Sequence, residues 1–204
     1  MNITHRRVNN GMTVLVIGLA LYLMLSPFWP ALMWRLHPVR PVPYDGKLRQ
    51  IVSGDNSVNV PSEAQPLPVG NRIVIPTAGV DIEIKQGNSI DIIGSGGSWY
   101  KPLWTKSPLE DGNTVIIAHR FWYGHANSGF YHLDQVKVGD VLAIYWQGQE
   151  LIYKVSEVKT VEPSDVSVEQ NSPDRRLTLY TCTPVITAEH RLVVIAKPYD
   201  GGGL

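Results

Sequence analysis

The residue best suited to covalent chemistry in this chain is its single cysteine, Cys182, at the end of the strand-like run LTLYTC (177–182). One cysteine excludes an intramolecular disulfide and a cysteine-based zinc cluster, because both need at least two. The thiol is therefore either a small buried hydrophobic group or a nucleophile. Strand alternation directs the two leucines and Thr181 to one face and Cys182 to the other. Since the leucines should face a core, this placement favours a reactive thiol.

Two further residues have chemistry that complements a thiol. His119 ends the apolar run TVIIAH, and Arg191 opens a late apolar run nine residues after Cys182. An imidazole transfers protons near neutral pH, and a guanidinium can hold a carbonyl or an oxyanion. The other histidines lie near the N-terminus or in loops and turns: His5, His37, His125, His132 and His190. The common alternative, a structural histidine and a surface arginine, stays open at this point.

The elements that must position these residues are short strands. Strand-like runs occur at 72–76, 80–84, 113–119, 141–146, 151–158, 176–181 and 191–197. Turn signals separate them, and Gln147-Gly148-Gln149-Glu150 is a hairpin signal. Long amphipathic helices are missing, although 88–96 and 128–136 are each compatible with a short helical turn. GSGGS (94–98) is read as a flexible connector, because no lysine-serine pair follows it as in a phosphate loop. The pattern predicts an all-β antiparallel barrel or sandwich.

The N-terminus has the composition of a membrane anchor. No charged residue occurs from Val8 to Trp34. As a helix, residues 12–34 would extend about 34 Å, enough to cross a hydrocarbon core of about 30 Å. Arg6 and Arg7 precede the run and no small-residue cleavage site follows it. We therefore expect residues 1–11 in the cytoplasm, a single transmembrane signal anchor and an extracytoplasmic remainder, with a cleaved signal peptide as the alternative.

Composition divides the rest of the chain. Residues 35–70 carry six prolines and no helical or alternating period, so we expect an extended or disordered extracytoplasmic tether. Residues 71–198 form the predicted β-domain, and 199–204 a flexible end. Lysine plus arginine (18) equal aspartate plus glutamate (18). Because nucleic-acid binders usually carry a basic excess, we expect no nucleic-acid partner.

Five stretches resemble the sortase family, the cysteine transpeptidases of bacterial cell surfaces. TLYTC (178–182) matches the family's TLxTC signature. IIAHR (116–120) is similar to the strand that delivers the histidine, and HRLVVIAK (190–197) to the strand that carries the arginine. RIVIPTAGVDIEI (72–84) and FYHLDQVKVGD (130–140) resemble the opening strands and a later connection. The resemblance covers about residues 70–198 and includes the order of the three reactive residues.

The resemblance implies a closed eight-stranded β-barrel with short helices, preceded by one transmembrane helix. It implies that Cys182 is the nucleophile, His119 the acid/base and Arg191 the clamp for the carbonyl or oxyanion. Beside the thiol, it implies substrate contacts from Thr181, Thr183 and Ala118. No cofactor or metal is expected; calcium is a feature of some members, but no such site can be assigned to this chain.

The implied partners are surface proteins with a C-terminal LPxTG-like sorting signal and an amine from a cell-wall precursor or a pilin lysine. The lipid bilayer is the further partner, through residues 12–34. The TCTP…HRL spacing is nearer the pilus-building and housekeeping classes, yet an Asp-Pro-aromatic lid motif is missing. We therefore expect a housekeeping-type or unclassified member. Two alternatives are a thiol peptidase or L,D-transpeptidase-like enzyme, and a non-catalytic, membrane-tethered β-domain that binds a surface partner.

Overall fold

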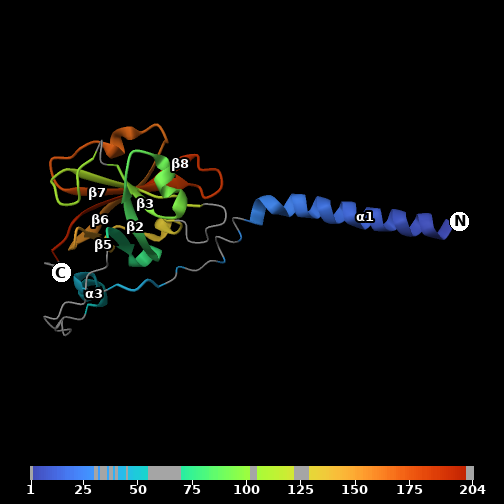
Figure 1. The fold of residues 1–204 in the computed structure, drawn as a ribbon, viewed down its shortest axis with the longest axis horizontal. Coiled ribbons are helices and arrows are strands. Elements are labelled where there is room, and N and C mark those ends of the chain that lie inside the picture. Colours follow the sequence, from blue (N-terminus) through green and yellow to red (C-terminus); the bar gives the residue numbers. More distant parts are fainter. Residues whose placement is uncertain are drawn as a thin grey trace. The chain divides into compact units, whose positions relative to one another are not determined.

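The computed structural model describes residues 2–29, 32, 36, 39, 41–44, 46–54, 70–101, 105–121 and 129–200 (Figure 1). The chain divides into two compact units, Met1–Pro38 and Val39–Leu204. Several expectations fall outside the described residues: His37 and His125, much of the predicted tether (55–69), and the end of the chain (201–204).

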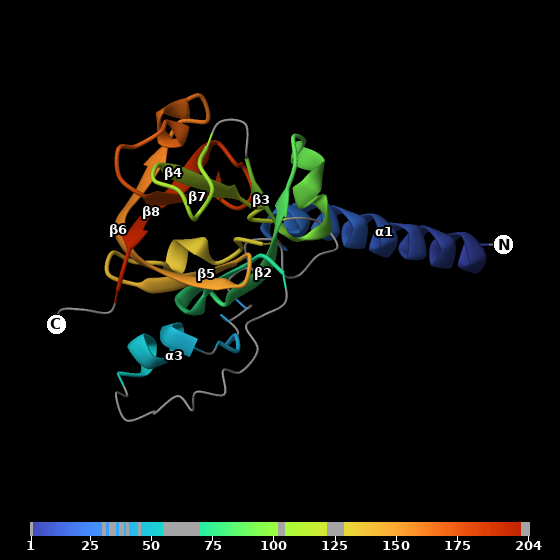
Figure 2. The same cartoon turned by 60° about the vertical axis from the view of Figure 1, so that its left-hand side comes forward.

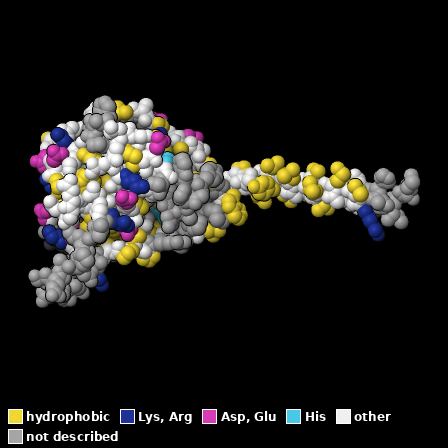
Figure 3. All heavy atoms as spheres, viewed as in Figure 1, with side chains coloured by type: hydrophobic (Ala, Val, Ile, Leu, Met, Phe, Trp, Pro, Cys, Tyr) yellow, Lys and Arg dark blue, Asp and Glu magenta, His cyan; other side chains and the backbone are white. Residues whose placement is uncertain are grey.

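The first unit contains a long helix, α1 (Asn2–Leu25), followed by the 3₁₀ turn η1 (Ser26–Phe28). Pro27 lies in the first turn of η1, as expected where a proline removes a backbone donor and ends an α-helix. Among the described residues, Arg7–Phe28 is the one helical stretch long and apolar enough to cross a membrane. Apolar side chains line α1 on the face shown in Figure 3. The helix begins at Asn2 rather than at the predicted residue 12 and ends at Leu25, and its length and composition are compatible with an anchor.

In the second unit, the described residues contain eight strands that close a barrel in the order β1-β2-β3-β4-β7-β8-β6-β5 (Figure 2). The strands are β1 (Arg72–Ile75), β2 (Val80–Gln86), β3 (Ser98–Tyr100), β4 (Asn113–Ile117), β5 (Val141–Trp146), β6 (Gln149–Val161), β7 (Arg176–Thr183) and β8 (His190–Pro198). Short 3₁₀ turns connect them: η2 (Pro76–Ala78), η3 (Ile90–Ser95), η4 (Leu133–Gln135) and η5 (Val166–Glu169). The predicted closed barrel is confirmed, and the sandwich alternative is wrong.

Two strand pairs correct the expectation of an antiparallel barrel. β2 pairs with β3, and β4 pairs with β7, in parallel. β3 is also an element that the sequence did not predict, because three residues carry too little alternation to be recognised. It begins at Ser98, which is fully buried and whose hydroxyl donates to the Glu83 carbonyl at 3.0 Å. The end of GSGGS is therefore an ordered part of the sheet rather than a flexible connector.

The barrel interior is filled by side chains that alternate inward along each strand. Leu177 and Leu179 of β7 are fully buried there, as their alternation predicted. Trp146 meets Tyr100 edge to face across the core, with ring centroids 5.3 Å apart. Such pairs add about 0.5–1.5 kcal/mol beyond the area that they bury. The core thereby fixes the register of β7, whose far end carries the cysteine.

A short helix, α3 (Gly46–Ser53), corrects the expectation that residues 35–70 are wholly extended or disordered. Its Leu48 is fully buried against the outer face of β1, β5 and β6. The Glu150 carboxylate accepts the backbone N–H groups of Lys47 and Leu48, at 2.9 and 3.2 Å, and so caps the helix. An eight-residue helix is unstable alone. It forms because the barrel supplies both the apolar surface and the cap.

Candidate active site

Three strands, β4, β7 and β8, are adjacent in the barrel (Figure 2): β7 carries Cys182, β8 carries Arg191, and His119 lies two residues beyond the end of β4. β7 and β8 are antiparallel, and their register pairs Cys182 directly with Arg191. Directly opposed residues on neighbouring strands have Cβ atoms roughly 4.5–5.5 Å apart. The nine-residue separation in sequence thus becomes direct cross-strand adjacency in space.

His119 reaches the same end of the barrel because β4 runs parallel to β7. The last ladder pair joins Ile117 to Tyr180. One residue further on, the Thr181 hydroxyl donates to the Ala118 carbonyl at 2.8 Å. Continuing this register places His119 level with Cys182. The fold therefore brings a thiol, an imidazole and a guanidinium to one edge of three neighbouring strands.

The thiol and the imidazole both occupy partly buried positions at this edge. Cys182 is a free thiol of intermediate exposure, neither sealed in the core nor fully in solvent. Burial lowers the pKa of His119 below its ordinary value, because desolvation disfavours the charged imidazolium. A histidine whose pKa is below 6.5 is largely neutral at pH 7. It can therefore accept a proton at that pH.

The Arg191 guanidinium is oriented by the loop between β7 and β8. Its Nη1 donates to the carbonyl oxygens of Ala188 and His190, both at 3.1 Å. These bonds engage one nitrogen of a planar group that carries five N–H donors in total. Opposite the thiol, such a fixed fork is suited to bind a carbonyl oxygen on which negative charge develops.

The three residues expected to contact substrate have different surroundings. Thr181 and Ala118 are buried, with 1% and 2% of their surface exposed, and they bond to each other beneath the site. Thr183 is half-buried, and its hydroxyl accepts a hydrogen bond from Arg120 Nη1 at 2.6 Å. Their contacts with a substrate stay predictions.

An ion-pair network beside the cysteine was not found from the sequence. Lys101 Nζ lies 2.8 and 3.0 Å from the two carboxylate oxygens of Glu169, at the end of η5. The Tyr180 hydroxyl donates to the same carboxylate. Burial, followed by the bond to Glu169, raises the pKa of Tyr180, so its hydroxyl stays protonated and remains a donor. No sequence signal links these residues, because they come from three separate segments.

The network holds η5 over the outer face of β7 and β8. Next to Glu169, Val168 packs with Val193 and Ile195 in an apolar cluster outside the barrel core. Tyr180 borders this cluster and lies on the same face of β7 as Cys182. The connection between β6 and β7 is thus packed against the outer face of β7, the strand that carries the thiol.

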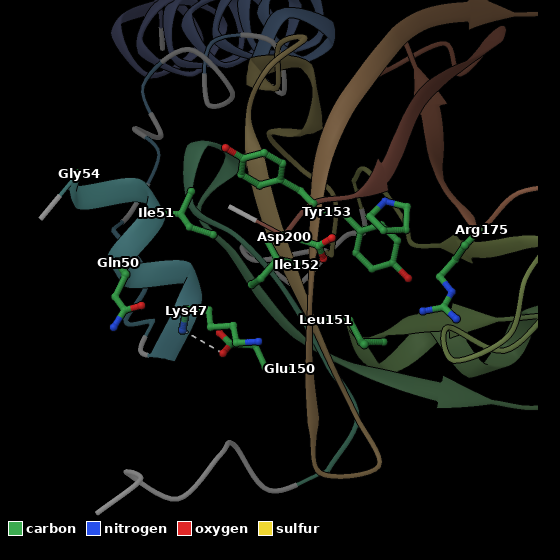
Figure 4. Close-up of a pocket in the computed structure, with 12 residues that line it drawn as sticks. Lys47, Gln50, Ile51, Gly54, Glu150, Leu151, Ile152, Tyr153, Arg175 and Asp200 are labelled. Carbon is green, nitrogen blue, oxygen red and sulfur yellow. Dashed lines mark hydrogen bonds between the residues drawn. The ribbon is translucent and has the colours of Figure 1, made fainter. Parts of the chain in front are cut away.

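A hollow of about 810 Å³ lies elsewhere, between α3 and the start of β6 (Figure 4). Charged side chains of both signs line it, among them Lys47, Glu150 and Arg175. The dashed contact in the figure is the Lys47–Glu150 bond that caps α3. Cys182, His119 and Arg191 are not among the lining residues. This hollow is therefore separate from the candidate site.

Comparison with known proteins identifies the domain that carries this site. A family model described as "Sortase domain" matches residues 73–199. Sortase SrtE2 of Streptomyces coelicolor is 30% identical over 128 residues, which cover 56% of this chain and 49% of the relative. The chain thus spans about half the length of this curated relative.

Solved structures with similar folds agree with that match. Sortase C1 of group B Streptococcus pilus island 1 superposes with a TM-score of 0.58 and 28% identity, covering 63% of each chain. A lid mutant of sortase A from Corynebacterium diphtheriae gives a TM-score of 0.58 and 30% identity, over 69% of this chain and 74% of the other.

Proposed function

Because the chain belongs to the sortase family, we propose that it is a membrane-anchored cysteine transpeptidase. It cleaves an LPxTG-like sorting signal through a thioester and transfers the acyl group to an amine. The observation that carries this proposal is the register of β4, β7 and β8. That register pairs Cys182 with Arg191 and ends β4 at Ile117, two residues before His119.

The first half of the reaction forms the thioester. His119 accepts the proton of the Cys182 thiol, and the resulting thiolate attacks the carbonyl carbon of the motif's threonine, while Arg191 stabilises the oxyanion. The carbon–nitrogen bond then breaks, and His119 donates a proton to the departing amine. An acyl-thioester on Cys182 and a free C-terminal fragment result.

The second half transfers the acyl group. An incoming amine, from a cell-wall precursor or a pilin lysine, attacks the thioester carbonyl while His119 accepts its proton. The carbon–sulfur bond breaks, a new amide forms, and the Cys182 sulfur recovers a proton from His119. Neither half consumes an oxidant or a reductant.

Features outside the three residues support the same proposal. The helical stretch Arg7–Phe28 has the length and hydropathy of a membrane anchor, and we propose a cytoplasmic N-terminus with an extracytoplasmic barrel. The connection 162–175 lies beside the cysteine strand, where it can contact an extended peptide and shape substrate choice. The pilus or housekeeping class stays open, with either a pilin lysine or a cell-wall amine as acceptor.

The experiment uses the full chain in detergent micelles. Peptides with LPxTG-like cores are incubated with a glycine or lysine amine, and products are read by mass spectrometry. We expect a thioester on Cys182 and an amine-exchanged peptide. The Cys182→Ala variant should give neither, and His119→Ala and Arg191→Ala should each lower turnover by about 10²-fold or more.

The outcome separates this proposal from its alternatives. Transpeptidation that persists in Cys182→Ala would refute the mechanism. Hydrolysis with every amine tested would favour a thiol peptidase. Absence of any adduct, together with a thiol that resists alkylation in the folded protein, would favour a non-catalytic binding domain. The intermediate exposure of Cys182 argues against an inert, sealed thiol.

A further inference from the structure

We propose that Arg120 is a positioning residue that holds His119 level with Cys182 by binding the residue that follows the cysteine. The inference rests on the proposed function, in which the imidazole and the thiol act on one substrate. Beyond that function, Arg120 explains what holds the imidazole in place past Ile117, where the pairing of β4 with β7 ends.

The backbone ladder alone does not reach His119. The described pairing of β4 with β7 ends at Ile117, two residues before the histidine. The next link is made by a side chain: the Thr181 hydroxyl donates to the Ala118 carbonyl at 2.8 Å. This contact ties the residue before His119 to the residue before the cysteine.

Arg120 makes the matching link on the other side. Its Nη1 donates to the Thr183 hydroxyl at 2.6 Å. The residue after His119 is therefore tied to the residue after Cys182. Two side-chain bonds extend the parallel register past the end of the ladder and bracket the reactive pair. Each passes through a threonine that flanks the cysteine.

The guanidinium is itself held firmly, as a positioning group must be. Arg120 is only 5% exposed, and its Nη2 lies 3.0 Å from Oδ1 of Asp134 in η4. The His119 carbonyl accepts the Phe130 N–H at 2.9 Å, which ties the histidine backbone to the segment just before η4. A nearly buried cation is costly to desolvate unless it is paired. The ion pair with Asp134 offsets this desolvation cost, and it orients the guanidinium so that Nη1 reaches the Thr183 hydroxyl.

The decisive variant is Thr183→Val, which removes the hydroxyl, preserves side-chain size and leaves the Arg120–Asp134 ion pair in place. We expect kcat for peptide transfer to fall about tenfold with KM unchanged, since a 1 Å misplacement of a catalytic group can cost about 10²-fold. Thr183→Ser, which keeps the hydroxyl, should recover most of the loss. Arg120→Lys, which keeps the charge and loses the fork, should be intermediate.

A second readout needs no peptide. The His119 imidazole is titrated by NMR in the full chain, with its signal assigned from the His119→Ala spectrum. In the wild type, burial should hold its midpoint below about 6.5, and in Thr183→Val the midpoint should rise toward that value as the ring gains solvent. Arg72→Met removes an ion pair with Asp81 between β1 and β2 and is the control. It should change neither kcat nor this titration.

Wild-type kcat and an unchanged His119 titration in Thr183→Val would overturn the inference. A loss confined to KM would also overturn it, because that result identifies Thr183 as a substrate contact. If the wild type transfers no peptide at all, the proposed function fails, and the titration still decides whether Arg120 positions the imidazole.

Discussion

Loss of Lys101 should destabilise the β6–β7 connection that packs beside the cysteine strand. Both of its contacts with Glu169 are short, and the two side chains are only 18% and 17% exposed. The Lys101→Met variant keeps most of the apolar stem and removes the charge. It leaves a largely buried carboxylate with the Tyr180 hydroxyl as a remaining donor.

The magnitude follows from this geometry. Removing one partner of a fully buried ion pair costs about 3–5 kcal/mol. The residual exposure and the Tyr180 bond reduce the cost to about 2 kcal/mol, within the range for hydrogen bonds to charged groups. For a folded unit of this size, such a loss lowers Tm by about 4–8 °C. The double variant Lys101→Met/Glu169→Gln, without an unpaired charge, should regain most of that loss.

The assay is thermal unfolding of the full chain in detergent micelles, followed by near-ultraviolet circular dichroism. Lys85→Met is the matched control, because its pair with Glu83 is long, at 3.9 Å, and more exposed; it should change Tm little. A Lys101→Met protein as stable as the wild type would refute the reasoning. So would a double variant less stable than the single one, since the cost would not then come from the unpaired carboxylate.

Three further predictions concern the histidine, the cap of α3 and the glycine next to Ala118. The His119 imidazole should titrate below its ordinary pKa, so on acidification the unfolded chain binds the proton before the folded protein does. The free energy of unfolding of the wild type, measured with urea, should therefore fall below about pH 6.5. The fall should be smaller in His119→Phe. Glu150→Ala removes the cap of α3 and should cost about 1–2 kcal/mol with early hydrogen exchange at the buried Leu48; unchanged exchange there would refute the docking. Gly129→Ala places a Cβ 2.5 Å from the Cβ of Ala118, so this variant should lower both kcat and Tm. Unchanged kcat and Tm would refute this steric reasoning.

The sequence indicated the candidate reactive groups, because residue type and short-range pattern are local information. A lone cysteine, a histidine at a strand end and an arginine opening the last strand are visible as residue types in short runs. The alternation along 177–182 assigned the leucines to the core and the cysteine to the opposite face, and burial confirms the core side. The apolar run near the N-terminus likewise predicted a long helix, which α1 confirms.

The sequence failed where stability comes from another part of the chain. α3 is too short to persist without the barrel face that buries Leu48 and the carboxylate that caps it. β3 has three residues and is recognisable only as the partner of β2 and β4. The ion pairs of Lys101 and Arg120 join residues 68 and 14 positions apart, and no local pattern links them.

What the sequence determined by itself is which groups can react and which face of each strand is apolar, since both depend on residue type and on a two-residue period. Only the tertiary structure decided that the segments carrying these groups lie side by side. The parallel pairing of β4 with β7 brings their two ends to one edge of the barrel, and the antiparallel return of β8 sets Arg191 opposite Cys182. Strand order and direction arise from packing of the whole core, which joins segments more than sixty residues apart, and so they are not encoded in any single run.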